Sequence, residues 1–318
     1  MAADRHPERD DLMDMGGLLN YAIFFATFAG IFAVVALGLN VQWGLSGQFN
    51  FGIAGFFAVG SYTTAILTSE PVATRIGGFD LPIVVGLAAA MILSALVAWA
   101  VGWVTAGLRT DYLAIATIGV AECIRLIVKN EDWLTNGVRG IPGIPRLAAE
   151  WFGPSPWIML LLVAACVIFA YAAIEAARAS PWGRLQLAIR ENERGATAAG
   201  KNIARARLEA FVFGAAFMGL GGALYAHLFG FISPEAFGPN FSTFLVWVML
   251  IAGGSGNNRG AILGSFVIWL IWSGTEILTN RLPVEYVNQA GALRLLFIGL
   301  LVQVVLIYRP QGLLPEKL

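Results

Sequence analysis

Long apolar runs separated by short polar segments dominate the pattern of this chain. A helix needs about 20 mostly apolar residues to cross the ~30 Å hydrocarbon core of a bilayer. Eight or nine such stretches occur, near 17–39, 49–68, 81–105, 111–128, 157–177, 209–231, 242–254, 261–279 and 291–308. The seventh is short, as in a broken or re-entrant helix. Because lipid offers no hydrogen-bond partners to the backbone, these runs predict an all-α polytopic membrane protein and not a barrel.

The polar segments predict a single transmembrane domain. We expect a polar N-terminal tail over 1–16, a transmembrane domain over 17–308 with a basic loop at 178–208, and a C-terminal tail over 309–318. Two glycine-rich polar segments interrupt the apolar pattern, GLSGQFNFGIAG from Gly44 and GGSGNNRGAILG from Gly253. Interrupted segments in both halves of a transporter are typical of an inverted repeat. An interrupted second helix and an inverted repeat are therefore expected.

Composition supports this fold class. The chain is 58% hydrophobic and 13% charged, whereas a soluble domain has roughly 25% charged residues. The two cysteines, Cys123 and Cys166, each lie within an apolar run, which predicts small buried hydrophobic residues and neither a disulfide nor a metal site. Because the sequence shows no cluster of catalytic or metal-ligating side chains, we expect no enzymatic activity, no cofactor and no nucleic-acid partner.

The distribution of Lys and Arg predicts the orientation. Loops on the cytoplasmic side carry an excess of these residues, and the loop 178–208 is the richest. Placing it in the cytoplasm puts the C-terminus there as well. The N-terminus is outside if the second segment crosses once, and inside if that segment is broken into two crossings. The basic residues expected inside are Arg109, Arg178, Arg184, Arg190, Arg194, Lys201, Arg205, Arg207, Arg259, Arg309 and Lys317.

The run GATAAGKN, from Gly195 to Asn202, nearly matches a phosphate-binding loop. Such a loop needs a preceding strand and a hydroxyl residue after the lysine, and the chain offers neither. The segment instead predicts a two-turn helix that ends at Gly200, with Asn202 capping the next helix. A cytoplasmic helix between two spans, with small side chains on its surface, suits docking into a groove on another protein. The alternative is a solvated basic loop.

Polar residues within the apolar stretches are candidates for a solute path. Ser46, Gln48 and Asn50 lie in the first glycine-rich segment, where they could contact a solute or bond neighbouring helices. Glu122 and Arg125 are three residues apart on one helix and are expected to pair. Glu122 is the more deeply placed charge of the two, and ionisable groups in a span usually face a bundle interior or a water-filled cavity.

These residues resemble a known family, the branched-chain amino-acid ABC transporter permeases of the LivM type. The resemblance is carried by GRLQLAIRENERGATAAGKNIARARLEAFVFGAAFMGLGGALYA (183–226), SGQFNFGIAGFFAVGSYTTAIL (46–67), DYLAIATIGVAECIRLIV (111–128), GGSGNNRGAILGSF (253–266) and RPQGLLP (309–315). It implies a coupling helix that docks on an ATPase subunit. The coupling residues would be Arg190, Glu191, Asn192, Glu193, Ala196, Thr197, Ala198 and Gly200. Gly195 and Thr197 depart from the alanine or larger residues usual there.

The resemblance also implies the partners. They would be a homologous second permease, two ABC ATPase subunits and an extracytoplasmic solute-binding protein that docks near the outer loop 129–156. This chain would form half of a translocation path in a bacterial cytoplasmic membrane, as a multi-pass subunit, and the implied solutes are leucine, isoleucine and valine. Two alternatives stay open: an importer of urea, amides or other small solutes, and an ion-coupled secondary transporter.

Overall fold

The computed structural model describes residues 7–72, 75–105, 108, 110–146, 155–279, 296, 299, 300, 303, 304, 307–309 and 311–316. These residues form an almost wholly helical chain. Its elements are α1 (Pro7–Asn40), the π-helical turn η1 (Val41–Leu45), α2 (Ile53–Thr68), α3 (Ile83–Thr105), α4 (Thr110–Asn130), α5 (Asp132–Thr135), η2 (Gly137–Arg139), β1 (Ile141–Pro142), α7 (Pro156–Ala179), α8 (Pro181–Glu191), α9 (Glu193–Ala198), α10 (Ile203–Phe229), β2 (Phe231–Ile232), η3 (Pro234–Phe237), η4 (Asn240–Phe244), α11 (Leu245–Gly253) and α12 (Asn258–Thr279).

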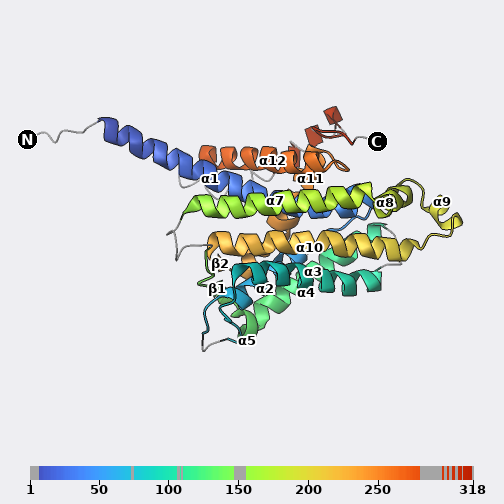
Figure 1. Ribbon diagram of the computed structural model, residues 1–318, viewed down its shortest axis with the longest axis horizontal. Helices are drawn as coiled ribbons and strands as arrows, with labels where there is room; N and C mark the ends of the chain where they lie inside the picture. Colours follow the sequence, from blue (N-terminus) through green and yellow to red (C-terminus); the bar gives the residue numbers. More distant parts are fainter. Residues whose placement is uncertain are drawn as a thin grey trace, which may run out of the picture.

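The long helices run side by side along the long axis of the molecule (Figure 1). The start of α1 and the pair α8 and α9 lie at opposite ends, and the C-terminal residues lie at the α8–α9 end. At the other end, β1 and β2 form a short antiparallel pair in which Ile141 faces Ile232. The described start of α1, at Pro7, thus lies at the end of the molecule opposite α8 and α9.

Four helices among the described residues are long and apolar enough to cross a membrane: Gly16–Leu45, Ile83–Thr105, Pro156–Ala179 and Ile203–Phe229. Two shorter apolar helices, Ile53–Thr68 and Ser242–Gly253, match the expected second and seventh stretches. Helix α2 is continuous from Ile53, and the non-helical segment 46–52 precedes it and includes the start of the expected second stretch. Most of the ninth expected stretch, 291–308, lies outside the described residues.

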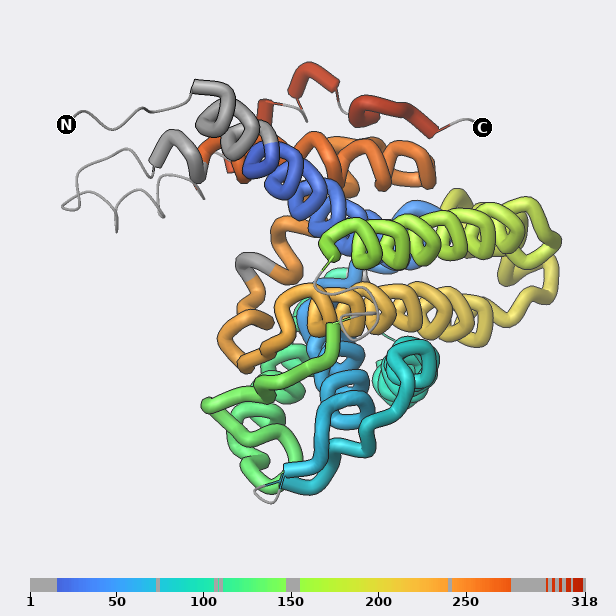
Figure 2. The backbone as a smooth tube through the Cα atoms, turned by 60° about the vertical axis from the view of Figure 1, so that its left-hand side comes forward, coloured from blue at the N-terminus to red at the C-terminus, as the bar shows by residue number. Residues whose placement is uncertain are grey.

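The centre of the bundle is formed by α1 and α10. Within an 18-residue apolar stretch of each span, 78% of the residues are buried in the span that contains α1 and 72% in α10. The corresponding shares are 28% in α3 and 22% in α7. The outward side chains of the peripheral helices are large and apolar, with Trp103 on α3 and Leu161 on α7 as examples. Figure 2 shows α10 between α7 and the α2–α3 side of the molecule. An apolar exterior on peripheral helices is what a lipid-facing surface requires.

Glycines allow α10 to lie against α2 at backbone contact. A Cβ atom on Gly60 would overlap the carbonyl oxygen of Gly219, and one on Gly222 would overlap that of Phe57. In this contact Ser61 Oγ donates a hydrogen bond to the Gly222 carbonyl oxygen at 2.7 Å. Small residues at helix interfaces permit such close packing where water cannot drive association. The abundance of glycine in the sequence thus has a structural use in this contact.

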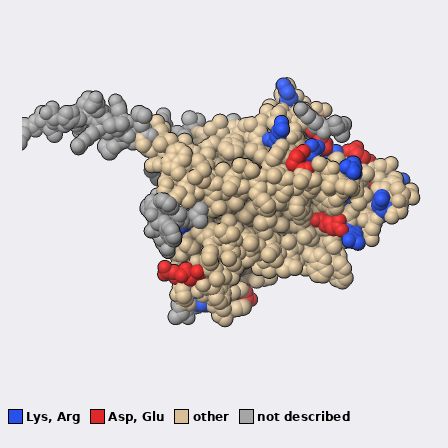
Figure 3. Space-filling model, in the orientation of Figure 1, with Lys and Arg blue, Asp and Glu red and all other residues tan. Residues whose placement is uncertain are grey.

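Charged side chains gather at the two ends of the face shown in Figure 3, with a broad uncharged belt between them. This distribution fits a protein whose middle section lies in a bilayer.

One expectation about the apolar runs was wrong. Cys123 is exposed on α4, and Cys166 is only partly buried. Position within an apolar run did not decide burial here, because α4 lies at the periphery of the bundle and packs chiefly against α2.

Candidate functional site

A compact hairpin of α8 and α9 projects at one end of the bundle (Figure 1). Asn192 separates the two helices and caps α9, its Oδ1 accepting a hydrogen bond from the Gly195 amide at 2.9 Å. Gly200 has φ +74° and follows the end of α9. Asn202 then caps α10, with its Oδ1 3.0 Å from the Arg205 amide nitrogen. The predicted helix end at Gly200 and helix start after Asn202 are confirmed.

The hairpin and the start of α10 share a small apolar core. Ile189, Ala196 and Ala206 are buried together, with Leu185 and Ile203 packed against them. Ala196, predicted to contact an ATPase subunit, therefore faces inward and supports α9. The structure thus assigns it a packing role that the sequence pattern did not show.

Most of the other predicted coupling residues lie on the surface of the hairpin, where Glu191 pairs with Arg190 and the Thr197 hydroxyl donates to the Glu193 carbonyl oxygen, both at 2.9 Å. Glu191, Thr197, Ala198 and Gly200 are exposed on the hairpin. Asn192 and Glu193 are also exposed, and their side chains are engaged as well, Asn192 in the cap and Glu193 in an ion pair with Arg207 at 2.9 Å. Two further residues share this exposed surface, Arg194 and Lys201. They were not among the predicted coupling residues, although their charge and loop position were visible in the sequence.

Arg190 points from α8 into the membrane domain. Its Nη1 donates a hydrogen bond to the carbonyl oxygen of Gly44, and its Nη2 lies 2.9 Å from both Glu316 Oε2 and Glu191 Oε1. Burial acts to lower the pKa of Arg190, but the hydrogen bonds to Glu316 and Glu191 outweigh burial and raise that pKa above its usual value. Arg190 is therefore a fully charged link between the hairpin and the bundle.

The two glycine-rich segments meet at this link, where a Cβ atom on Gly44 would lie 2.6 Å from the Gly256 amide nitrogen. Asn40, at the end of α1, donates from Nδ2 to Asn258 Oδ1 at 2.9 Å and accepts at Oδ1 from the Gly256 amide at 2.8 Å. The C-terminal tail joins the junction. The Leu313 amide donates to the Ala252 carbonyl oxygen and the Leu314 amide donates to the Gly253 carbonyl oxygen, both at 2.9 Å. The hairpin, both interrupted segments and the tail thus form one hydrogen-bonded junction.

The polar residues of the first segment are buried and engaged with their neighbours. Gln48 Nε2 donates to Ser46 Oγ and to the Arg207 carbonyl oxygen, both at 2.9 Å. Asn50 Nδ2 donates to Gln42 Oε1 at 2.7 Å, and its carbonyl oxygen accepts from Trp247 Nε1 at 3.0 Å. The polar groups of this segment therefore bond one another and neighbouring helices, as one of the two interpretations expects.

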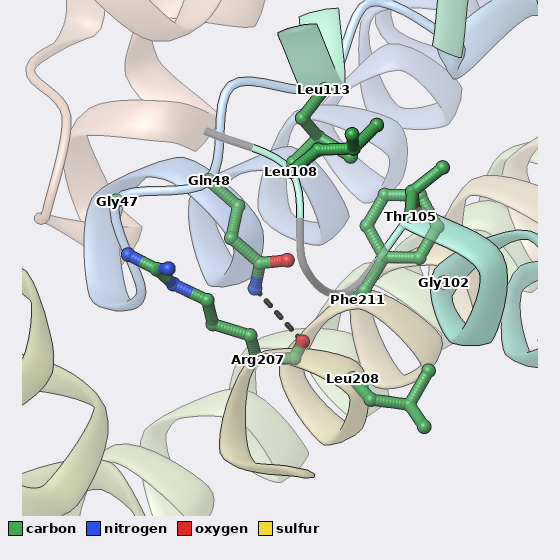
Figure 4. Close-up of a pocket in the computed structure, with 9 residues that line it drawn as sticks. All are labelled: Gly47, Gln48, Gly102, Thr105, Leu108, Leu113, Arg207, Leu208 and Phe211. Carbon is green, nitrogen blue, oxygen red and sulfur yellow. Dashed lines mark hydrogen bonds between the residues drawn. The ribbon is translucent and has the colours of Figure 1, made fainter. Parts of the chain in front are cut away.

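A small cavity lies beside Gln48 (Figure 4). Its volume is about 20 Å³, which is room for roughly one water molecule. Figure 4 shows Gln48 reaching from its loop toward the backbone of α10, with the Arg207 side chain beside it and mostly apolar residues around the rest of the cavity. The lining residues are Gly47, Gln48, Gly102, Thr105, Leu108, Leu113, Arg207, Leu208 and Phe211. In this conformation the cavity is too small for an amino acid.

Glu122 and Arg125 form the expected pair on α4. Arg125 Nη2 lies 2.5 Å from Glu122 Oε1, and Arg125 Nε lies 2.9 Å from Glu122 Oε2. Helix α4 contacts the first glycine-rich segment through a different residue, Thr117, whose Oγ1 accepts from the Phe51 amide at 3.0 Å. The four predicted path residues therefore divide into the buried network of Ser46, Gln48 and Asn50 and the separate, half-exposed Glu122.

Comparisons with known proteins cover nearly the whole chain. A family described as "Branched-chain amino acid transport system / permease component" matches residues 21–306. The high-affinity branched-chain amino acid transport system permease protein LivM of Salmonella typhimurium is 31% identical over 92% of this chain and 70% of its own length. LivH of the same organism, described in the same words, is 25% identical over 90% of this chain and 94% of its own length.

A probable LivM of Methanocaldococcus jannaschii is 28% identical over 91% of both chains. No solved structure gives a significant match.

Proposed function

The chain belongs to the branched-chain amino acid transport permease family, and we propose that it forms half of the translocation path of an ATP-binding-cassette importer for branched-chain or related small amino acids. The family is one of transport permeases, and the apolar helices make this member a multi-pass membrane protein. On this proposal the chain performs no covalent chemistry, and ATP is hydrolysed by partner subunits.

We infer a heteromeric assembly. LivM and LivH relatives both align with about nine-tenths of this chain, which supports pairing with a homologous second permease. Two ABC ATPase subunits and an extracytoplasmic solute-binding protein complete the proposed complex in a bacterial cytoplasmic membrane. Eight or nine crossings and an inverted repeat belong to the same proposal. The described part of the loop 129–156, with α5 and β1, lies at the end opposite the hairpin, and the binding protein would dock there.

The observation that carries the proposal is the attachment of the α8–α9 hairpin. Its exposed residues, including Glu191, Thr197 and Ala198, are available for an ATPase subunit. Arg190, beside the turn between α8 and α9, donates a hydrogen bond to the Gly44 carbonyl oxygen in η1, the turn that follows α1. A displacement of the hairpin by an ATPase subunit would therefore act directly on the point where the two glycine-rich segments meet.

On this proposal the solute path opens by rearrangement of that junction. Non-helical backbone at membrane depth is tolerated where protein or a water-filled cavity surrounds it, and the segment containing Ser46, Gln48 and Asn50 has this character. Its hydrogen bonds hold the closed state. Glu122 is the ionisable residue proposed for the same path.

Uptake by a reconstituted complex tests the proposal. The purified chain, its second permease, the ATPase subunits and the binding protein are placed in proteoliposomes, and uptake of leucine, isoleucine, valine, urea and a small amide is measured. We expect ATP-dependent uptake of the branched-chain amino acids that stops when the ATPase subunits are omitted and persists when ion gradients are collapsed. Uptake that needs an ion gradient and no ATPase would establish a secondary transporter instead.

A further inference from the structure

Helix α4 carries a row of alternating charges on its outer side. Glu122, Arg125 and Lys129 are three and four residues apart, so they lie on one face of the helix. Glu235 of η3 joins this row, with its Oε1 3.0 Å from Lys129 Nζ and 3.9 Å from Arg125 Nη1. We call Glu122, Arg125, Glu235 and Lys129 the α4 charge ladder. Its signs alternate from the interior of the helix toward its C-terminal end.

This chain leaves the ladder partly exposed along its length. The side chain of Glu122 retains 43% of its exposure and that of Arg125 retains 21%. Gly119, Cys123 and Leu126 beside them are exposed as well. Glu122 lies about 12 Å along the helix from Asn130, at the ~1.5 Å rise per residue. Charged groups at that depth of a membrane-spanning bundle need a surrounding that the chain itself does not supply.

Water is the surrounding that suits these groups best. Lipid is the least favourable, because a charge in hydrocarbon is costly and ionisable residues in spans face a bundle interior or a water-filled cavity. A dry contact with another subunit is also unfavourable, since the cores of protein interfaces are depleted of charged residues. The side chain of Glu235, at the outer end of the ladder, remains 65% exposed. The row of charges therefore runs from the middle of α4 to the outer surface of the protein.

We propose that the α4 charge ladder is one wall of the outer half of the solute path, and that it guides zwitterionic amino acids. This inference rests on the proposed importer function. An ammonium group complements the carboxylates of Glu122 and Glu235, and a carboxylate complements Arg125 and Lys129. Arg125 Nη1 approaches Glu235 only to 3.9 Å, beyond hydrogen-bond distance, so it can donate to a passing carboxylate. The second permease supplies the facing wall.

Cys123 provides a reporter beside the ladder. The chain has two cysteines, so Cys166→Ala leaves Cys123 as its single thiol. The control is Ala164→Cys in a Cys166→Ala, Cys123→Ala background, because Ala164 is exposed on α7 among outward apolar residues. In the full complex, reconstituted with a cysteine-free second permease, the rate of reaction with a charged, membrane-impermeant methanethiosulfonate is measured from outside. We expect Cys123 to react at least 10-fold faster than Cys at 164, and leucine with the binding protein to slow it.

The charge of the ladder is tested in the same assay. Glu122→Gln should lower the ratio of the rates with cationic and anionic reagents at Cys123 several-fold, and leave that ratio unchanged at position 164. If Cys123 reacts only with a lipid-soluble maleimide, the face lies on lipid and the inference is wrong. If Cys123 reacts with neither reagent, it is sealed in a subunit contact and the inference is equally wrong. ATP-dependent uptake measured in the same vesicles shows whether the importer function itself stands.

Discussion

Arg190 on the hairpin and Glu316 in the C-terminal tail form an ion pair, with 2.9 Å between Nη2 and Oε2. Both side chains are about four-fifths buried, so solvent screens this pair less than an ordinary surface pair. Because Arg190 also binds the Gly44 carbonyl oxygen, the pair joins the hairpin, the tail and the end of α1.

Replacing Arg190 by Gln should uncouple hydrolysis from transport. The loss of its bonds to Gly44 and Glu316 frees the hairpin from the junction, so we expect ATP hydrolysis by the complex to continue while amino-acid uptake falls about 10-fold or more, as for loss of ~1.4 kcal/mol of coupling. Uptake and hydrolysis are measured on the same proteoliposomes. Arg184→Gln is the matched control, because Arg184 is exposed on α8 and, among the described residues, its side chain bonds the nearby Ala179 carbonyl oxygen alone. Equal uptake in both variants would contradict the linkage.

Ala198→Trp should prevent the ATPase subunit from docking. Ala198 is exposed on the short helix α9, and an indole there would separate the two proteins without disturbing the hairpin core. We expect co-purification of the ATPase to fall at least 10-fold, with normal membrane insertion; Glu191→Lys should act in the same direction. Ala179→Trp serves as the control at another exposed alanine, at the end of α7. Full ATPase binding by Ala198→Trp would exclude α9 from the docking surface.

Gly60→Ala should destabilise the bundle. A methyl group on Gly60 would overlap the Gly219 carbonyl oxygen of α10, and overpacking of this kind costs about 1–3 kcal/mol. We expect the Tm of the purified chain in detergent to fall by several degrees. Gly274→Ala is the control, since a Cβ atom there meets nothing within 4 Å and should leave the Tm unchanged or slightly raised. A Tm of Gly60→Ala equal to that of the wild type would mean that α2 and α10 do not touch as described.

Asn50→Leu should weaken the buried network around the first glycine-rich segment. The substitution leaves Gln42 Oε1 and the Gly52 amide without their partner side chain, and buried unsatisfied polar groups cost about 1–3 kcal/mol each. Ser46→Ala, which removes one hydrogen bond to Gln48, should cost less, about 0.5–1.5 kcal/mol. Thermal denaturation monitored by circular dichroism gives both values. If the two substitutions lower the Tm equally, the network is not centred on Asn50.

Local signals in the sequence were sufficient for the hairpin boundaries. Gly200 and Asn202 act through their own backbone conformation and capping bond, so the residue type at each position carries the information. The pairing of Glu122 with Arg125 was predictable for the same reason, because three residues along a helix place both side chains on one face. The direction of the Arg190 side chain could not be predicted in this way, because its partners Gly44 and Glu316 are 146 and 126 residues away in the chain.

The sequence by itself determined that this protein is a helical membrane permease of its family, because apolar runs of about 20 residues have few other stable forms and the family similarity extends over residues 21–306. The tertiary structure decided which polar groups face one another. Asn40 and Asn258, 218 residues apart, meet only because α1 packs against α12. Ala196 and Cys123 show the same dependence, since burial follows from the packing of whole helices and not from the residues beside them.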